Sequence, residues 1–269
     1  MSELVTISIT DQIADVRLNR PDKLNALSQD MFVAISAMID RLADESKVRV
    51  VVLSGEGKGF CAGLDTSLFA SSSLTDATKD GTSLVVRRKN NIANWAQYIC
   101  YGWKQLPMPV IAVIHGACLG GGCQMALGAD FRFATPDSKL SIREMYWGLI
   151  PDMSVSQTIR DLMPIDKAKE LIYTAKIISG EEAGNINLVT RVCSDPMDEA
   201  MTLAREIAGK SPHAIRAAKK LLNEAWHGDD TDGLLLESAL ESSLIGRTNN
   251  VEAVMANMEK REPKFTDPE

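Results

Sequence analysis

The chain has 269 residues, of which 45% are hydrophobic and 24% are charged. These shares exclude a disordered or fibrous protein, and the length fits one large domain or two modest ones. Lys and Arg number 29 against 36 Asp and Glu, which gives a formal net charge of −7. Such a balance argues against a dedicated nucleic-acid-binding protein, although a local basic patch for an anionic small molecule remains compatible with it.

Cysteine usage and the N-terminus both predict a cytoplasmic protein. The first four residues lack the basic region and apolar segment of a secretory signal. The five cysteines form no Cys-x-x-Cys pair, and their odd number favours reduced thiols. The three histidines lie far apart and lack the spacing of metal ligands, so no metal site is expected.

From Gln105 to Ala129 the chain has 25 residues without Asp, Glu, Lys or Arg, which is long enough to span a bilayer. Two prolines and the glycine triplet at 120–122 interrupt this stretch, and its strong apolar run covers only residues 110–114. Such a run of β-branched and small apolar residues is typical of a buried strand. We therefore expect a core strand followed by a glycine turn, and no membrane span.

The other elements follow from hydrophobic periodicity. In chain order, it predicts a hairpin of strands at 4–8 and 13–18, a helix over 29–44 capped by Ser28, a strand over 49–53, a mobile loop over 65–90, a helix over 91–103, and strands at 110–114 and 131–133. Later helical patterns cover 167–176, 197–208, 213–226, 231–245 and 249–260. This order predicts an α/β core over 1–200 and a helical oligomerisation region over 201–269.

Two glycine turns share one arrangement, in which a buried strand is followed by small residues and a helix. They cover residues 60–65 and 115–124. Glycines at such turns leave backbone N–H groups free, and two turns on adjacent strands can direct two donors at one carbonyl oxygen, forming an oxyanion hole. The run Gly55-x-Gly57-x-Gly59 lacks the third glycine of a dinucleotide-binding pattern. Tight turns without a ligand remain the structural alternative.

Two carboxylates, Glu144 and Asp152, lie in an apolar and aromatic segment. Desolvation raises the proton affinity of a carboxylate, which suits a general acid or base. Glu144 could instead form an ion pair with Arg143 or Lys139, and Asp152 could cap a helix.

Several segments, in this order and spacing, resemble the crotonase superfamily, also called the enoyl-CoA hydratase/isomerase family. The resemblance covers nearly the whole chain. It is carried by residues 18–27 (LNRPDKLNAL), the Ala-Gly-x-Asp turn within 60–65, the glycine triplet at 120–122, residues 178–183 (ISGEEA) and the ending at 259–265 (EKREPKF).

The resemblance implies an α/β spiral of ββα units with a helical C-terminal trimerisation region, hence a homotrimer or a dimer of trimers. It implies an acyl-CoA thioester substrate whose carbonyl accepts hydrogen bonds from the N–H groups of Leu64 and Gly121, with no further cofactor. Two fixed donors stabilise an enolate oxygen where its charge develops. The other substrate contacts that it implies are Lys23, Ala26, Ala62, Gly63, Asp65, Trp147 and, from a neighbouring subunit, Lys260. A solvated surface position is the alternative for each lysine.

Two positions depart from the hydratases that this chain resembles. Those proteins carry one glutamate just after the glycine triplet and a second at the place of Glu144, but here the first is Gln124. An amide can orient a group but cannot exchange a proton as a carboxylate does. Asp152 stands where those hydratases have glycine. An acid eight residues after the glutamate resembles the dienoyl-CoA isomerase branch, which in turn has an aspartate at the Gln124 position.

The sequence therefore predicts a CoA-thioester enzyme that forms or quenches an enolate, most simply by proton transfer in double-bond isomerisation. Glu144 and Asp152 form the expected acid/base pair, with Gln124 as a polar orienting group and Trp147 in the wall of the acyl pocket. The alternatives are an enoyl-CoA hydratase, another acyl-CoA transformation such as thioester hydrolysis, and a catalytically silent acyl-CoA-binding protein.

Overall fold

A six-stranded sheet lies at the centre of the computed structural model, which describes residues 3–70 and 84–268. Its strands, in spatial order, are β1 (Val5–Thr10), β2 (Ile13–Leu18), β3 (Val50–Gly55), β4 (Val110–Ile114), β6 (Phe131–Ala134) and β9 (Arg191–Val192). The first two strands form the predicted antiparallel hairpin, and every other neighbouring pair is parallel. The carboxyl ends of the five parallel strands therefore meet at one edge, whereas β1 runs in the opposite direction.

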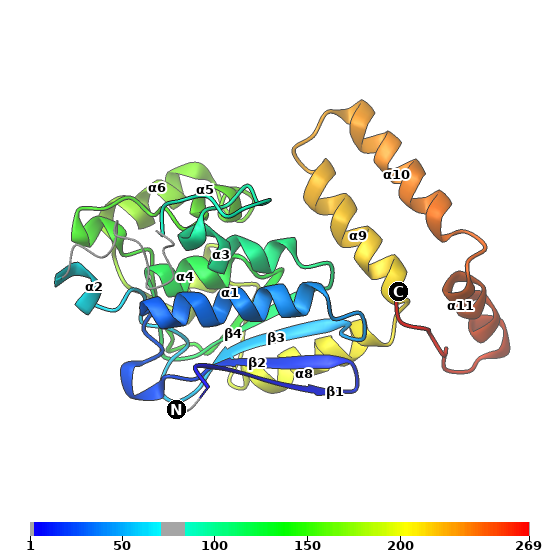
Figure 1. Ribbon diagram of the computed structural model, residues 1–269, viewed down its shortest axis with the longest axis horizontal. Helices are drawn as coiled ribbons and strands as arrows, with labels where there is room; N and C mark the ends of the chain where they lie inside the picture. The colour runs from blue at the N-terminus through cyan, green and yellow to red at the C-terminus, as the bar shows by residue number, and fades with distance from the viewer. Residues whose placement is uncertain (1–2, 71–83, 269) are drawn as a thin grey trace.

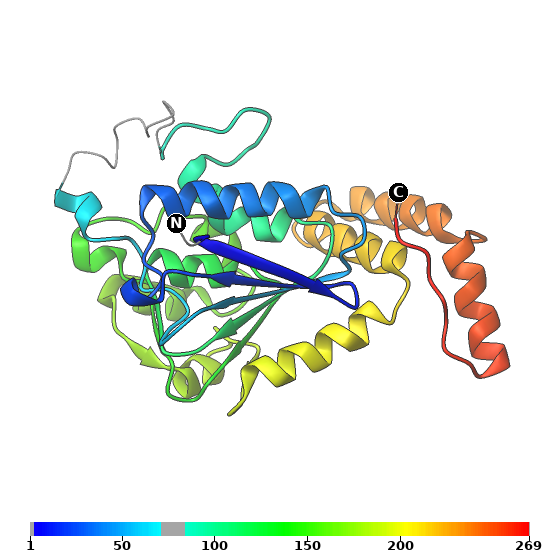
Figure 2. The ribbon, with the colours of Figure 1, turned by 60° about the horizontal axis from the view of Figure 1, so that its bottom comes forward.

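Helices cover both faces of this sheet (Figures 1 and 2). The helical segments are η1 (Pro21–Lys23), α1 (Gln29–Ala43), α2 (Ser67–Ala70), α3 (Trp95–Gln105), α4 (Gly121–Leu127), η3 (Glu144–Trp147), α5 (Val155–Thr158), α6 (Ile165–Thr174), α7 (Gly180–Asn185), α8 (Pro196–Ala208), α9 (Pro212–Ala225), α10 (Asp230–Leu244) and α11 (Thr248–Glu259). The five late helices predicted from periodicity are confirmed with ends within two residues.

Alternation along the strands divides the core into two layers. In β3, Val51 and Leu53 join the larger core with α1, α3 and α4, whereas Val50 and Val52 pack with the alanine face of α8. Side chains alternate across a strand, so a strand that is apolar on both faces must be covered on both. Figure 2 shows α1 on one side of the sheet and α8 on the other.

A second, three-stranded sheet lies beside the first and supports the glycine turns. It consists of β5 (Ala117–Leu119), β7 (Lys139–Ser141) and β8 (Ile178–Ser179). The uncharged stretch 105–129 thus supplies the buried strand β4, the short strand β5 and the glycine-led helix α4. Over residues 3–70 and 84–268, no helix is both long enough and apolar enough to cross a bilayer.

The predicted helix over 91–103 begins four residues late, at Trp95. Asn94 is its N-cap, and its side chain accepts a hydrogen bond from Gln97 N while the Gln97 side chain accepts one from Asn94 N. This capping box fixes the start more strongly than the polar residues before it. The predicted loop over 65–90 contains α2, and its residues 71–83 lie outside the described part of the chain.

The C-terminal helices α9, α10 and α11 extend beyond the sheet, with α10 and α11 set apart from it in Figure 1. The expected division at residue 200 falls inside α8, which packs on the sheet, so the projecting part begins with α9. Helix α10 packs on α9 and has no buried residue, and Leu234 and Leu235 are each 64% exposed. This region therefore presents apolar side chains that the rest of its own chain does not cover.

Candidate active site

The two glycine turns lie against each other. Cys61 N donates to Ala117 O and Leu119 N donates to Cys61 O, each over 2.9 Å, so the turn after β3 is joined to β5. Gly63 has a φ of +87°, and a Cβ at this position would lie 2.6 Å from Leu119 O and 3.5 Å from Gly121 N. The absence of a side chain at Gly63 is therefore what allows the two turns to approach.

Two backbone donors remain available at this junction. Among the described residues, neither Leu64 N nor Gly121 N donates a hydrogen bond to a protein acceptor. Gly121 is the first residue of α4, where the N–H groups have no partner within the helix and the helix dipole favours negative charge. These are the two N–H groups that the family resemblance implies for an oxyanion hole, and both residues lie where the turns meet.

The carboxylate of Glu144 lies next to the second glycine turn. A Cβ built on Gly120 would lie 3.4 Å from Glu144 Oε1, which places the carboxylate beside the start of α4. The Glu144 side chain makes no ion pair with Arg143, Lys139 or any other described residue, so the ion-pair alternative is excluded. Instead, Gln124 Nε2 donates a hydrogen bond to Glu144 Oε1 over 2.6 Å.

Gln124 is completely buried and connects Glu144 to the segment that follows Asp152. Its Oε1 accepts a hydrogen bond from Met153 N over 2.9 Å. A backbone N–H can only donate, so this bond fixes which end of the amide faces Glu144. Glu144 Oε2, by contrast, is buried and has no hydrogen-bond partner among the described residues. The amide therefore holds one carboxylate oxygen and leaves the other available.

Burial raises the pKa of both carboxyl groups. For Glu144 desolvation is the main cause, with a smaller contribution from the negative charge of Asp152, and the hydrogen bond from Gln124 acts in the opposite direction. Desolvation also raises the pKa of Asp152, although that residue is solvent-exposed at the mouth of the site. Asp152 is not a helix N-cap, because α5 begins at Val155 with Ser154 before it. A raised pKa brings a carboxyl closer to the range in which it exchanges protons.

These groups surround one cavity of about 480 Å³, which we call the active-site cavity. Its lining includes Ala62, Gly63, Leu64, Gly120, Gly121, Arg143, Glu144, Trp147 and Asp152, together with apolar side chains of Phe32, Leu84, Val85, Ala96, Leu119, Leu149 and Met153. The volume falls within the usual range for small-molecule sites. Among the described residues of the wall, the charged side chains are those of Arg143, Glu144 and Asp152, and the rest of this wall suits an apolar chain.

Two of the expected contact residues, Ala26 and Asp65, are bonded to Arg20 next to the first turn and do not line the cavity. The Asp65 carboxylate accepts a hydrogen bond from Arg20 Nη1 over 2.6 Å, which lowers the pKa of Asp65 to about 2. The same Arg20 nitrogen donates to Ala26 O over 3.0 Å. Arg20 lies in the LNRPDKLNAL segment, but its effect on the turn depends on contacts 45 residues away that periodicity does not reveal.

Lys23 and Lys260 lie at different distances from the cavity. Lys23 ends η1, and the next residue, Leu24, accepts a hydrogen bond from Ala62 N, so Lys23 is close to the first turn. Lys260 directly follows α11 as its C-cap, and this helix is far from the turns of its own chain in Figures 1 and 2. Within this chain, Lys260 therefore does not belong to the active-site cavity.

A family profile described as enoyl-CoA hydratase/isomerase matches residues 8–268. The chain belongs to this family. The peroxisomal Delta(3,5)-Delta(2,4)-dienoyl-CoA isomerase of Arabidopsis thaliana is 32% identical, over 98% of this chain and 96% of that protein. The mitochondrial methylglutaconyl-CoA hydratase of Mus musculus is also 32% identical, over 92% of this chain and 77% of that protein.

The crystal structure of an enoyl-CoA hydratase from Bacillus anthracis superposes with a TM-score of 0.85 at 30% identity, covering 97% of this chain and 98% of that one. The predicted crotonase fold is thereby confirmed. The relatives of this chain thus include proteins named as an isomerase and as a hydratase, at the same identity to it.

Proposed function

We propose that this enzyme binds an acyl-CoA thioester, stabilises its enolate, and moves a proton to shift a carbon–carbon double bond. The observation that carries the proposal is the pair of unengaged donors, Leu64 N and Gly121 N, facing the same cavity as Glu144. An enolate places its negative charge on the thioester oxygen, and preorganised N–H groups stabilise that charge in a water-poor site.

Glu144 is the base in this proposal, acting through Oε2. Gln124 engages Oε1, so Oε2 is the oxygen free to accept a proton from a carbon of the substrate. The electron pair of the broken C–H bond enters the enolate, and reprotonation at the far end of the conjugated system completes the double-bond shift. Asp152, which lines the same cavity and also has a raised pKa, is the proposed donor for that second step.

A hydratase is the second candidate, favoured by the relatives that are named for hydration. Addition of water needs one group to activate the water and another to protonate the substrate. Gln124 cannot exchange a proton, so Asp152 would have to supply the second carboxyl. Glu144 and Asp152 would then act on water and on the α-carbon, respectively.

The two candidates are separated by the direction of the absorbance change. With 3-enoyl-CoA or 3,5-dienoyl-CoA, the proposed isomerase increases the absorbance of the conjugated thioester, whereas a hydratase decreases it with 2-enoyl-CoA. A thiol reagent run in parallel detects free CoA from any hydrolysis. The proposal fails if the enzyme, saturated with acyl-CoA, produces no conjugated thioester from either 3-enoyl-CoA or 3,5-dienoyl-CoA.

We further propose that the enzyme is a homotrimer or a dimer of trimers, in which a neighbour's Lys260 approaches the CoA entrance next to Lys23. The proposal is supported by exposed apolar side chains at the two surfaces that would meet, one near the active-site cavity and the other on α11. Tyr146 and Ile150 near the cavity are 63% and 71% exposed, and Met258 on α11 is 77% exposed. Light scattering should give a multiple of three chains, and Leu234→Glu together with Leu235→Glu should lower it. A monomeric wild type would exclude this arrangement.

A further inference from the structure

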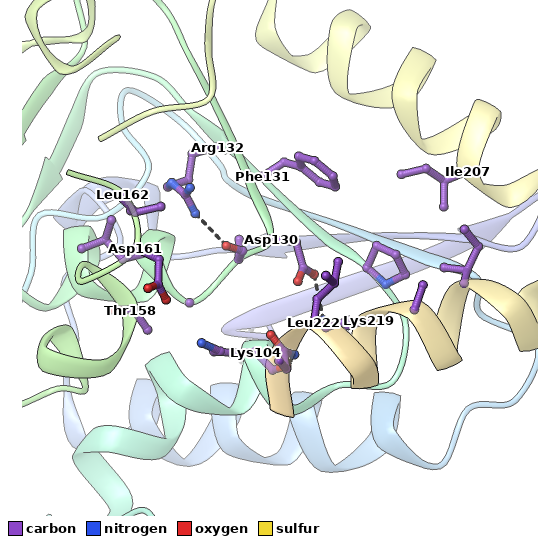
Figure 3. A pocket seen from close by; sticks show the side chains of 17 residues that line it. Lys104, Asp130, Phe131, Arg132, Thr158, Asp161, Leu162, Ile207, Lys219 and Leu222 are labelled. Carbon is purple, nitrogen blue, oxygen red and sulfur yellow. Dashed lines mark hydrogen bonds and ion pairs between the residues drawn. The ribbon is translucent and has the colours of Figure 1, made fainter. Parts of the chain in front are cut away.

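A second cavity of about 480 Å³ lies outside the active site, between the end of α4, strand β6 and helix α9 (Figure 3). Leu127, the last residue of α4, is in its wall, whereas Gly121, the first residue, is in the wall of the active-site cavity. Helix α4 is buried along its whole length. The two cavities are therefore separate sites at opposite ends of one short helix.

The carboxylates in the wall of the second cavity already have partners of their own. Asp130 forms an ion pair with Lys219 over 2.7 Å, and Lys219 Nζ also donates to two backbone carbonyls. Asp161 contacts His227 Nε2 over 2.6 Å and Arg160 Nε over 3.9 Å. Neither carboxylate is thus the salt-bridge partner of the two remaining cations in the wall.

Those two cations are Arg132 and Lys104. Arg132 is only 5% exposed, and its Nε and Nη1 donate to Leu188 O and Ala129 O, which are neutral acceptors. Within residues 3–70 and 84–268, its Nη2 has no hydrogen-bond partner, and neither Arg132 nor Lys104 lies within salt-bridge distance of a carboxylate. The nearby Asp130 charge acts on Arg132 without forming an ion pair with it. A buried guanidinium without a directly bonded anion is costly, so its surroundings favour a ligand that brings one.

The wall of the second cavity is polar at one end and apolar at the other. In Figure 3, Arg132 and Lys104 lie toward the side of Asp161 and Thr158, while Phe131 and Ile207 lie on the opposite side. Desolvation lowers the pKa of Arg132 to about 10 even though the charge of Asp130 acts in the opposite direction, so an incoming anion would relieve the penalty that remains on its charge. A guanidinium binds a carboxylate through two parallel N–H groups, and here Nη2 is still free to donate.

We propose that the second cavity binds an apolar monocarboxylate of the size of a medium-chain fatty acid, with its carboxylate at Arg132 and Lys104 and its chain along Phe131 and Ile207. This site is independent of the proposed reaction. The proposed head-group is a free carboxylate and not a thioester carbonyl, because the carbonyl is neutral and would leave the two cations without an anion.

Isothermal titration of the full protein with octanoate, and with 1-octanol as the uncharged match, tests the proposal. Octanoate should bind at least tenfold more tightly than 1-octanol, and Lys104→Ala should weaken octanoate binding by about threefold to tenfold. Lys104 is chosen because Arg132 also supports the backbone. Equal binding of the two probes would overturn the carboxylate assignment.

A second variant, Ala218→Phe, tests whether octanoate binds in the second cavity. Ala218 is an exposed residue of α9 that lines this cavity. The substitution should abolish octanoate binding while leaving kcat and KM for the acyl-CoA substrate and the melting temperature unchanged. If octanoate still binds to Ala218→Phe, or if a saturating acyl-CoA displaces it from the wild type, the acid occupies the active-site cavity and the proposal is wrong.

Discussion

The side-chain amide of Gln124 donates a hydrogen bond to Oε1 of Glu144 over 2.6 Å. This contact places an amide where the family resemblance leads us to expect a second carboxylate in a hydratase, and among the described residues Oε2 of Glu144 has no hydrogen-bond partner. A site with one buried base and an orienting amide suits proton transfer between carbons better than concerted addition of water.

Removal of the Gln124 amide should show whether it positions Glu144 or contributes to substrate binding. Gln124→Leu takes away the donor that stabilises ionised Glu144, so kcat should fall by about 10- to 100-fold with little change in KM. Because that hydrogen bond opposes the burial effect, its loss should also raise the pKa of Glu144 further and move the acid limb of the kcat profile to higher pH. A lower kcat with an unmoved acid limb would indicate only a packing defect.

The converse substitution should change the reaction. Gln124→Glu introduces a second carboxyl next to Glu144, which is the pair that the family resemblance leads us to expect in a hydratase. Hydration of 2-enoyl-CoA should rise relative to isomerisation of 3-enoyl-CoA, by about tenfold or more in the ratio of the two kcat/KM values. An unchanged ratio would mean that position 124 does not select between the two reactions.

The wild-type pH profile follows from the direction of the pKa shifts. Glu144 must be ionised to accept a proton, and burial raises its pKa above the ordinary 4.5. Activity should therefore fall with decreasing pH at values above 4.5, measured as kcat/KM in buffers of constant ionic strength. An acid limb at or below 4.5 would contradict a buried catalytic glutamate.

The close approach of the two turns can be tested at Gly63. Alanine there would need a φ of +87° and would bring Cβ to 2.6 Å from Leu119 O, so Gly63→Ala should displace Leu64 N and lower kcat by about 10²- to 10³-fold. Gly246→Ala is the matched control, because φ is +74° there and the new Cβ meets nothing within 4 Å. Equal losses of activity in both variants would show that the close approach of the two turns is not required for catalysis.

Stability should show the cost of burying the charge of Glu144. A carboxyl whose folded pKa is raised binds more protons when folded, so stability falls as pH rises from the unfolded pKa through the folded one. Glu144→Gln should therefore have a higher melting temperature than the wild type at pH 8, and the difference should shrink toward pH 4. Each 1 kcal/mol in the free energy of unfolding corresponds to about 2–4 °C. A variant that melts below the wild type at pH 8 would contradict this assignment.

Sequence patterns predicted most of the fold because long buried strands and amphipathic helices carry clear periodicity. The short strands β5, β7, β8 and β9 have two or three residues each and no readable period, so they were missed. One of them, β5, is nevertheless the strand that hydrogen-bonds to the first turn, and β7 pairs with it.

The site was predictable where local chemistry was sufficient, as for Glu144 in its apolar segment. The bond from Met153 N to Gln124 and the pairing of Arg20 with Asp65 join residues 29 and 45 positions apart, and only the folded chain brings them together. The same holds for Arg132 and Lys104 in the second cavity, which lie on β6 and α3.

Deuterium exchange tests the proton transfer most directly, because it reports on the carbon acid itself, whatever the final product. In D₂O, the wild type should exchange deuterium into recovered 3-enoyl-CoA and its conjugated product, as measured by mass spectrometry. Glu144→Gln should retain acyl-CoA binding and lose this exchange by about 10²-fold or more. Equal exchange by Glu144→Gln and the wild type would show that Glu144 is not the base and would contradict the account.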